Sequence, residues 1–179
     1  MYNPVLDNAK TVLPNDKHID KEHIDKEKSP KVKQTPSKIE QGWETTLSDV
    51  GNAERLVKRH GSKIKYCASL GKWFIWNGKI WEKDNSGKIV SYAIKTARSV
   101  YQEASLATNL DDQKKVLKHA LKSQERPRLA AMAYIAQHMV AVNQDELDSD
   151  PWLLNVENGT VDLKTGNLLP HDPEKLLTK

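Results

Sequence analysis

The order of apolar and polar positions divides the sequence into segments with different periods. Residues 46–61 carry capping side chains, then an apolar-periodic stretch, then a glycine, which predicts a short helix with Gly61 as its left-handed C-cap. Residues 63–68 then alternate with a period of two, which predicts a strand. Two aromatic runs flank Asn77-Gly78 and predict a hairpin with a type I′ turn, in which both central residues have positive φ.

The middle of the chain predicts three amphipathic helices. The first has an apolar stripe of period 3.6 over residues 90–104. The second begins at Asp111-Asp112, and four residues form its predicted apolar face: Val116, Leu117, Ala120 and Leu121. The third runs over 123–142, with Pro127 in its first turn, where a missing N–H is tolerated. Its broad apolar face predicts the central helix of the core.

Residues 151–170 predict a meander of three short strands. The predicted turns are Asn158-Gly159 and the segment 164–167. The expected fold class is therefore α+β: a small N-terminal antiparallel hairpin sheet, a three-helix middle and a C-terminal β-meander.

The first forty-two residues have a different composition. They contain one aromatic residue, four prolines and an immediate repeat of His-Ile-Asp-Lys-Glu at 18–22 and 23–27. A five-residue repeat matches neither the helix nor the strand period, and the apolar area is too small to offset the entropy of ordering the backbone. We expect residues 1–42 to be a disordered charged tail and 43–179 to be one folded domain.

Composition limits the classes of function. Mean hydropathy is −0.71, and no apolar run approaches the roughly 20 residues of a membrane span. The N-terminus lacks the pattern of a signal peptide, so we expect a cytoplasmic protein without a membrane partner. The one cysteine, Cys67, excludes an internal disulfide and a multi-cysteine zinc site. A net charge of +4 permits a nucleic-acid partner without requiring one.

Four blocks of the sequence carry a family resemblance. They are Gly51 to Gly61; Gly71 to Gly78 with Trp81; Lys118-His119-Ala120 with Ser123; and Asp150 to Val156 continuing through Asn158 to Leu163 with Thr165-Gly166. In this order they resemble the domain that precedes the superfamily 3 helicase module in phage and plasmid primase–helicases, of which the poxvirus primase–helicase is a distant relative. The resemblance runs from about residue 49 to residue 179.

The resemblance implies a role in DNA replication. In that family the domain lies between a primase region and a hexameric helicase, and the whole protein unwinds and often primes DNA at an origin. It implies here a non-catalytic connector and assembly domain, with a helicase module as partner in cis or in trans, and a homo-oligomeric assembly. We expect the ATPase domain to be absent, so that ATP and Mg²⁺ belong only to that missing module. The alternative is a free-standing nucleic-acid-binding or regulatory protein of a mobile element.

The sequence lacks the motif that nucleotide hydrolysis needs. A phosphate-binding loop requires Gly-x4-Gly-Lys followed by Ser or Thr. Three Gly-Lys pairs occur, at residues 71, 78 and 87, but none is followed by Ser or Thr or preceded by a glycine at the required spacing. We therefore expect no ATP hydrolysis, and no cofactor, in this chain alone.

An acidic loop is the other candidate for chemistry. Its carboxylates can hold Mg²⁺ or act as acid and base; they are Asp145, Glu146, Asp148 and Asp150. The alternative is that they cap helices and turns, because no nucleophile or histidine is local. His119 and His138 lack metal-ligand spacing and are expected to be structural or solvent-facing.

Basic and aromatic residues give the candidate nucleic-acid site. Lys114, Lys118 and Lys122 recur every four residues, which on a helix makes a row that can follow phosphates. Strand alternation places Trp73 and Ile75 on one face of the aromatic hairpin and Phe74 and Trp76 on the other. One set is expected to be core, and the other can stack on bases, at ~1–3 kcal/mol per base. The alternatives are an ordinary solvated face and a packed sheet. The candidate residues for weak binding of single-stranded DNA are Lys114, Lys115, Lys118, Lys122, Arg126, Arg128 and Trp76. A second, weaker basic cluster is Arg55, Lys58 and Arg59.

Overall fold

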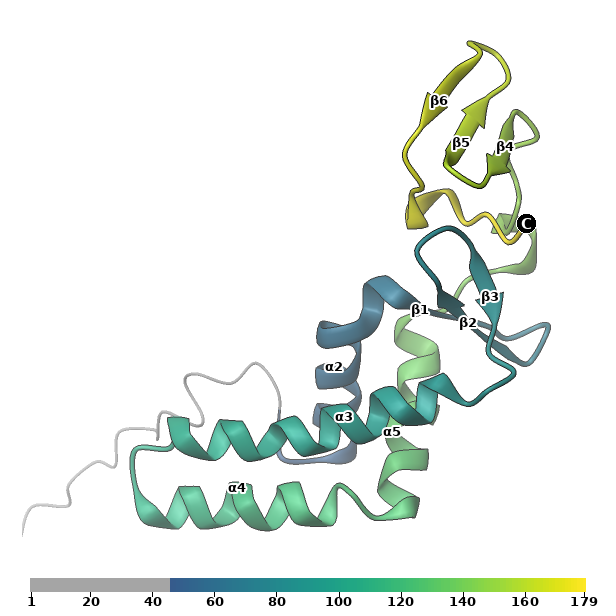
Figure 1. Ribbon diagram of the computed structural model, residues 1–179. Coiled ribbons are helices and arrows are strands. Elements are labelled where there is room, and N and C mark those ends of the chain that lie inside the picture. The colour runs from purple at the N-terminus through teal and green to yellow at the C-terminus, as the bar shows by residue number, and fades with distance from the viewer. Residues whose placement is uncertain (1–45) are drawn as a thin grey trace, which may run out of the picture. The chain divides into compact units, whose positions relative to one another are not determined.

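The computed structural model describes residues 46–179, and the predicted tail lies outside the described residues (Figure 1). The described part holds helices and two antiparallel three-stranded sheets, which confirms the α+β fold class. Its main elements are α2 (Asp49–His60), β1 (Ile64–Cys67), β2 (Lys72–Trp76), β3 (Trp81–Lys83), α3 (Lys88–Glu103), α4 (Leu110–Lys122), α5 (Arg126–Met139), β4 (Leu153–Val156), β5 (Gly159–Asp162) and β6 (Asn167–Leu169). Within residues 46–179 no helix combines the length and apolarity that crossing a membrane requires.

The ends of α2 show one correct and one wrong prediction. The side chain of Ser48 accepts a hydrogen bond from the Gly51 N–H at 3.1 Å, as the capping residues predict. Gly61 is not left-handed, because its φ is −57°. The chain continues from α2 into a short 3₁₀ helix, Gly61–Lys63, and from there into β1. A helix that ends in this way needs no residue of positive φ.

Side chains also fix where α3 and α4 begin. Asp84 accepts hydrogen bonds from the backbone N–H groups of Lys88 and Ile89, both at 2.9 Å. Burial alone would raise the pKa of Asp84, but these N–H bonds outweigh it and hold the pKa below its ordinary value. Asn109 caps α4 by accepting from the Asp112 N–H at 2.8 Å. The third predicted helix, α5, begins later than predicted, at Arg126, and has its proline in the first turn as expected.

The first sheet has the order β1-β2-β3. The hairpin between β2 and β3 is confirmed, but its type I′ turn is wrong, because Gly78 has positive φ (106°) and Asn77 does not. Instead Asn77 Oδ1 accepts from the N–H groups of Lys79 and Ile80, at 2.8 and 2.9 Å. The asparagine side chain thus stabilises a longer loop, and β3 begins only at Trp81.

Both faces of the first sheet are buried. On one face Ile64 and Ile75 pack with residues of α2, α3 and α5, and Trp73 lies on this side. On the other face Phe74 and Trp81 pack with Cys67, and Trp76 lies against them. The predicted alternation along β2 is therefore confirmed, and the sheet uses its aromatic residues for packing on both sides.

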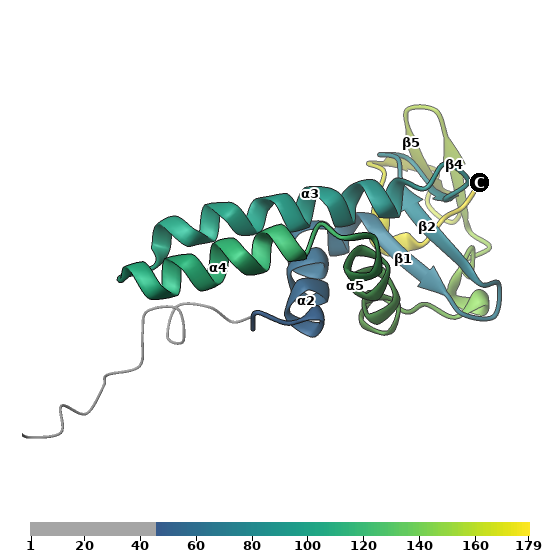
Figure 2. The same ribbon diagram turned by 90° about the horizontal axis from the view of Figure 1, so that it is seen from below.

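Helix α4 lies alongside α3, as both views show (Figures 1 and 2). The contact buries Val116 and Ala120 of α4 against Val100 and Ala104 of the preceding segment. The prediction that Leu117 and Leu121 share this buried face is wrong: their exposed fractions are 40% and 67%. Because α4 packs mainly on one neighbouring helix, only a narrow stripe of its surface is covered.

The second sheet has the order β4-β5-β6, as the predicted meander requires. Its first turn differs by one residue: Val156 pairs with Gly159, so the turn is Glu157-Asn158. Gly159 itself is buried in β5, and a Cβ there would lie 2.4 Å from the carbonyl oxygen of Leu169. A side chain at this position would therefore push β6 away.

Candidate nucleic-acid interface

The predicted lysine row lies on the solvent side of α4. Lys114, Lys118 and Lys122 are all exposed, whereas Val116 and Ala120 are fully buried. Successive lysines are about 6 Å apart along the helix axis and advance by roughly 40° around it. Their ammonium groups therefore form a diagonal row across the exposed surface of one helix.

These three lysines have no ion-pair partner within residues 46–179. Lys115 differs, because its Nζ lies 3.0 Å from Asp112 Oδ1 one turn earlier. Arg126 is exposed at the first residue of α5. Of the predicted basic residues, the three lysines are exposed on one face of α4, with Lys115 beside them and Arg126 exposed at the start of α5.

Arg128 has a role inside the fold. Its Nη1 lies 2.6 Å from Asp49 Oδ2, so it joins α5 to the first residue of α2. A phosphate would have to compete with this carboxylate. Arg128 is therefore set apart from the lysine row, although it follows closely in sequence.

Trp76 is also not brought together with the lysines. Its ring lies beside that of Trp81, with centroids 5.7 Å apart, and packs against the cluster that contains Phe74. The side chain is half-buried on the sheet, whereas α4 packs on α3. The structure gives Trp76 a packing role that the sequence had left as one of two alternatives.

Arg55, from the weaker basic cluster, is buried. Its Nε donates to both carboxylate oxygens of Glu103, at 2.9 and 3.0 Å, and its Nη1 donates to the backbone oxygen of Thr46 at 2.8 Å. Arg59 lies at the edge of the same carboxylate, 3.9 Å from it. Arg55 therefore joins α2 to the end of α3 and does not face solvent.

A buried polar network holds α4 from behind the lysine row. Asn52 Nδ2 donates to Ser123 Oγ at 2.9 Å, and the Asn52 Oδ1 lies 3.0 Å from His119 Nε2. Since Asn52 Oδ1 can only accept, His119 Nε2 carries the proton and donates to it. Burial, followed by the charge of Arg55, lowers the pKa of His119, so the imidazole is neutral near pH 7.

The acidic loop caps turns. The two oxygens of Asp148 accept from the N–H and the hydroxyl of Thr178, at 2.7 and 2.6 Å. Asp150 accepts from the Trp152 N–H, and Glu146 accepts from the Asn143 N–H. No three histidine, cysteine or acidic side chains gather as metal ligands anywhere in the part of the chain that the structure describes. The geometry agrees with the capping alternative.

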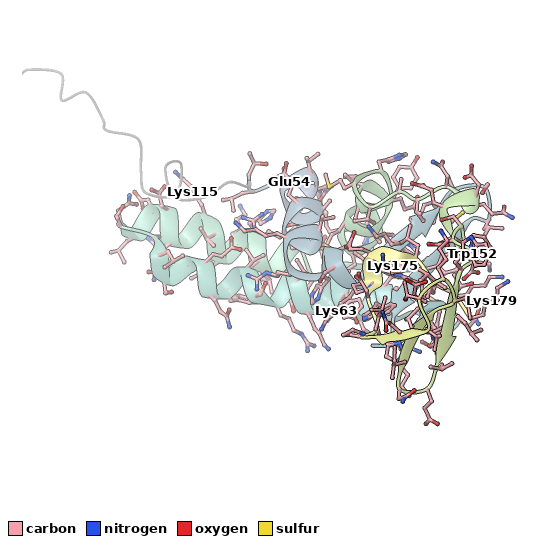
Figure 3. All side chains as sticks on the ribbon, turned by 90° about the horizontal axis from the view of Figure 1, so that it is seen from above. Glu54, Lys63, Lys115, Trp152, Lys175 and Lys179 are labelled. Atoms are coloured by element: carbon pink, nitrogen blue, oxygen red, sulfur yellow. The ribbon has the colours of Figure 1, made fainter. Side chains whose placement is uncertain are left out.

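Sequence reasoning did not predict that apolar residues are exposed beside the lysine row. Leu110, Leu117 and Leu121 are 71%, 40% and 67% exposed on α4. The sequence did hold one signal, the width of the apolar arc on this helix. Positions 110, 117 and 121 lie within about 40° of one another around the helix axis, whereas the buried Val116 lies about 120° from their centre. Figure 3 shows Lys115 on this helix, and Trp152 on the segment that leads into the second sheet.

Comparison with known proteins gives the family. A family model described as D5 N terminal like matches residues 53–179. Domains of this kind are found in phage and plasmid primase–helicase proteins. A search of curated proteins finds no match. Two of the resembling sequence blocks also meet in space, because Asn52 bonds to both His119 and Ser123. The chain belongs to the D5 N-terminal-like family.

Proposed function

We propose that this domain is a non-catalytic connector and assembly domain of a phage or plasmid replication primase–helicase, and that α4 contacts single-stranded DNA. The observation that carries the DNA contact is the exposed row Lys114, Lys118 and Lys122, which has no ion-pair partner within residues 46–179. Other basic side chains in this part of the fold, Arg55 and Arg128, are used in internal ion pairs. The row thus leaves three ammonium groups on one helix face available to an external anion.

The chemistry of the row fits a phosphate backbone better than a base. Helix α4 carries no Phe, Tyr or Trp, so it offers no ring for stacking. Lysine ammonium groups neutralise phosphates and release counterions, and this term is independent of sequence. We therefore propose weak, salt-sensitive and sequence-tolerant binding. ATP and Mg²⁺ would be used by a helicase module, in cis or in trans, in the cytoplasm.

Fluorescence anisotropy tests the DNA contact. The full chain is titrated into a labelled single-stranded oligonucleotide of mixed sequence at low and at physiological salt. The test variant replaces Lys114, Lys118 and Lys122 with glutamine. The matched control replaces Lys72, Lys83 and Lys88, which are also exposed and lie on the first sheet and at the start of α3. Both variants lose the same net charge.

The two variants should differ. Loss of three phosphate contacts should reduce the slope of log affinity against log salt by about 2, since each contact on a single strand contributes about 0.7. The control should retain nearly the full slope of the unmodified chain. Equal behaviour of the two variants would assign the binding to net charge and would overturn the proposed site on α4.

A further inference from the structure

Helix α4 carries an uncovered apolar row next to the lysines. It consists of Leu110, Leu117 and Leu121, defined here as the leucine row, and spans about 17 Å along the helix. Lys114 lies at one edge of this row, and Lys118 and Lys122 lie progressively further round the helix. Leucine exposed to this degree along a whole helix face is typical of a surface that another element covers.

The second sheet also has an uncovered apolar face. Strand register places Leu154, Val161 and Leu168 side by side across β4, β5 and β6. Trp152 and Leu163 extend the same face, since the Leu163 N–H donates to the Trp152 oxygen at 2.8 Å. Except for the half-buried Val161, these side chains are 49–52% exposed. We call this surface the open sheet face.

The two surfaces belong to segments of opposite net charge. Residues 110–128 contain six basic and three acidic residues, whereas residues 143–179 contain eight acidic residues and three lysines. Two exposed acids border the open sheet face: Asp150 precedes β4, and Glu157, whose side chain is 94% exposed and lies 3.9 Å from Lys79 Nζ, follows it. One lysine lies at the face itself, since Lys164 Nζ is 5.4 Å from the centroid of the Trp152 ring. The net negative charge of residues 143–179 as a whole favours a basic amphipathic helix as the partner of this face.

We propose that the open sheet face of one copy of the chain binds the leucine row of a second copy. The dimensions agree, because the face measures about 13 Å along β4 and about 10 Å across three strands, against about 17 Å for the row. Like faces are poor partners, since two α4 helices would oppose lysines and two open sheet faces would oppose acids. The contact is heterologous, so each copy retains one free surface of each kind and can add a further copy.

This inference goes beyond the DNA contact. It uses the leucine row, whereas the proposed DNA contact uses the lysines, of which Lys118 and Lys122 lie furthest from the row. The two proposals can therefore fail separately. Leu121→Glu leaves the lysines in place and should leave measurable DNA binding.

Two blocking variants of the full chain test the contact. Leu121→Glu blocks the leucine row, and Leu154→Glu blocks the open sheet face. By light scattering after size exclusion, the unmodified chain should increase in mass with concentration, and each variant alone should stay monomeric. An equimolar mixture of the two should form a dimer that grows no further, because each variant brings one intact surface. Val90→Glu, at a residue 49% exposed on α3, is the matched control and should associate as the unmodified chain does.

Several results would overturn the contact. An unmodified chain that stays monomeric at all concentrations would do so, and so would variants that associate alone or a mixture that stays monomeric. Circular dichroism confirms that each variant is folded. If one is not, Leu110→Glu and Leu168→Glu provide the same pair of blocks at positions 71% and 50% exposed.

Discussion

The two sheets of this domain have the same strand order and differ in what covers them. Each consists of three short antiparallel strands that follow one another in sequence. In β1–β3 both faces are closed, and Ile64, Phe74 and Trp81 are at most 2% exposed. In β4–β6 the face formed by Leu154 and its cross-strand neighbours is half exposed. Strand pairing therefore does not decide whether a sheet forms a core.

The difference arises from the segments that return to each sheet. Helices α2, α3 and α5 pack on one face of β1–β3. Val142 and Leu176 pack on the other face, and the backbone N–H of Trp81 donates to the backbone oxygen of Leu177 at 2.8 Å. No segment within the described residues covers the open sheet face in this way. The first sheet is therefore closed by its own chain, whereas one face of the second stays exposed among the described residues.

Truncation of one apolar residue in each sheet should give the largest difference in stability between the two sheets. Phe74→Ala in the first sheet should lower the free energy of unfolding by about 3–5 kcal/mol, because it leaves a cavity in a closed cluster. Leu168→Ala in the second sheet should cost less than about 1 kcal/mol in dilute protein, since its side chain is half exposed. Urea unfolding measures both. Similar losses for the two variants would contradict the distinction between a closed and an open sheet.

Gly159→Ala should show that the second sheet is precisely paired although it is open. A Cβ at this position would lie 2.4 Å from the Leu169 oxygen, so β6 has to move. We expect a loss of about 1–3 kcal/mol, the usual range for overpacking. Hydrogen exchange should show faster exchange in β5 and β6 and no change in β1–β3. An unchanged exchange rate in β6 would indicate that the strand pairing is looser than the structure shows.

The pH dependence of stability should report on the network that holds α4. Burial lowers the pKa of His119 in the fold, so the unfolded chain binds the proton more readily. The stabilising effect is fully present above the ordinary value near 6.5 and is lost as pH falls below it. Arg55 and Arg128 oppose protonation, whereas Asp49 and Glu103 favour it.

Glutamine variants separate this contribution from that of a second histidine. Burial, followed by the charge of Arg59, also lowers the pKa of His60. His119→Gln should reduce the loss of stability between pH 7 and pH 5, measured by urea unfolding at each pH. His60→Gln should remove a different part of it. If His119→Gln leaves the pH dependence unchanged, the imidazole is not held neutral by the fold.

The smallest effect is expected for the lysine row itself. Replacing Lys114, Lys118 and Lys122 with glutamine should change the free energy of unfolding by less than about 0.5 kcal/mol, because these side chains are exposed and form no ion pair with any residue that the structure describes. Thermal unfolding by circular dichroism measures this. A loss of several degrees would show that the row is part of the fold and is not available to a ligand.

The periodic parts of the sequence allowed the architecture to be predicted. Alternation along β2 placed Phe74 and Trp76 on one face and Ile75 on the other, as the structure has them. The predictions that failed depend on contacts distant in sequence or on turn geometry. Leu117 is exposed because α4 has only one main neighbour, which its own periodicity cannot reveal. Asn77 adopts a loop closed by its own side chain in place of a type I′ turn.

The candidate site was predicted in part. Spacing was sufficient to find Lys114, Lys118 and Lys122, because a helix places such residues on one exposed row. It was not sufficient to recognise that Arg128 pairs with Asp49, which lies 79 positions earlier. The exposure of the leucine row and of the open sheet face was not predicted for the same reason, since exposure depends on which elements pack together.

Hydrogen exchange of the full chain at low and high protein concentration tests the central claim most directly: the first sheet is closed by its own chain, and the second is completed by a partner. We predict that amides of β1–β3 exchange slowly and equally at both concentrations. Amides of β4–β6 and α4 should exchange faster in dilute protein and become protected together as the concentration rises. Equal, concentration-independent protection of the two sheets would contradict the account.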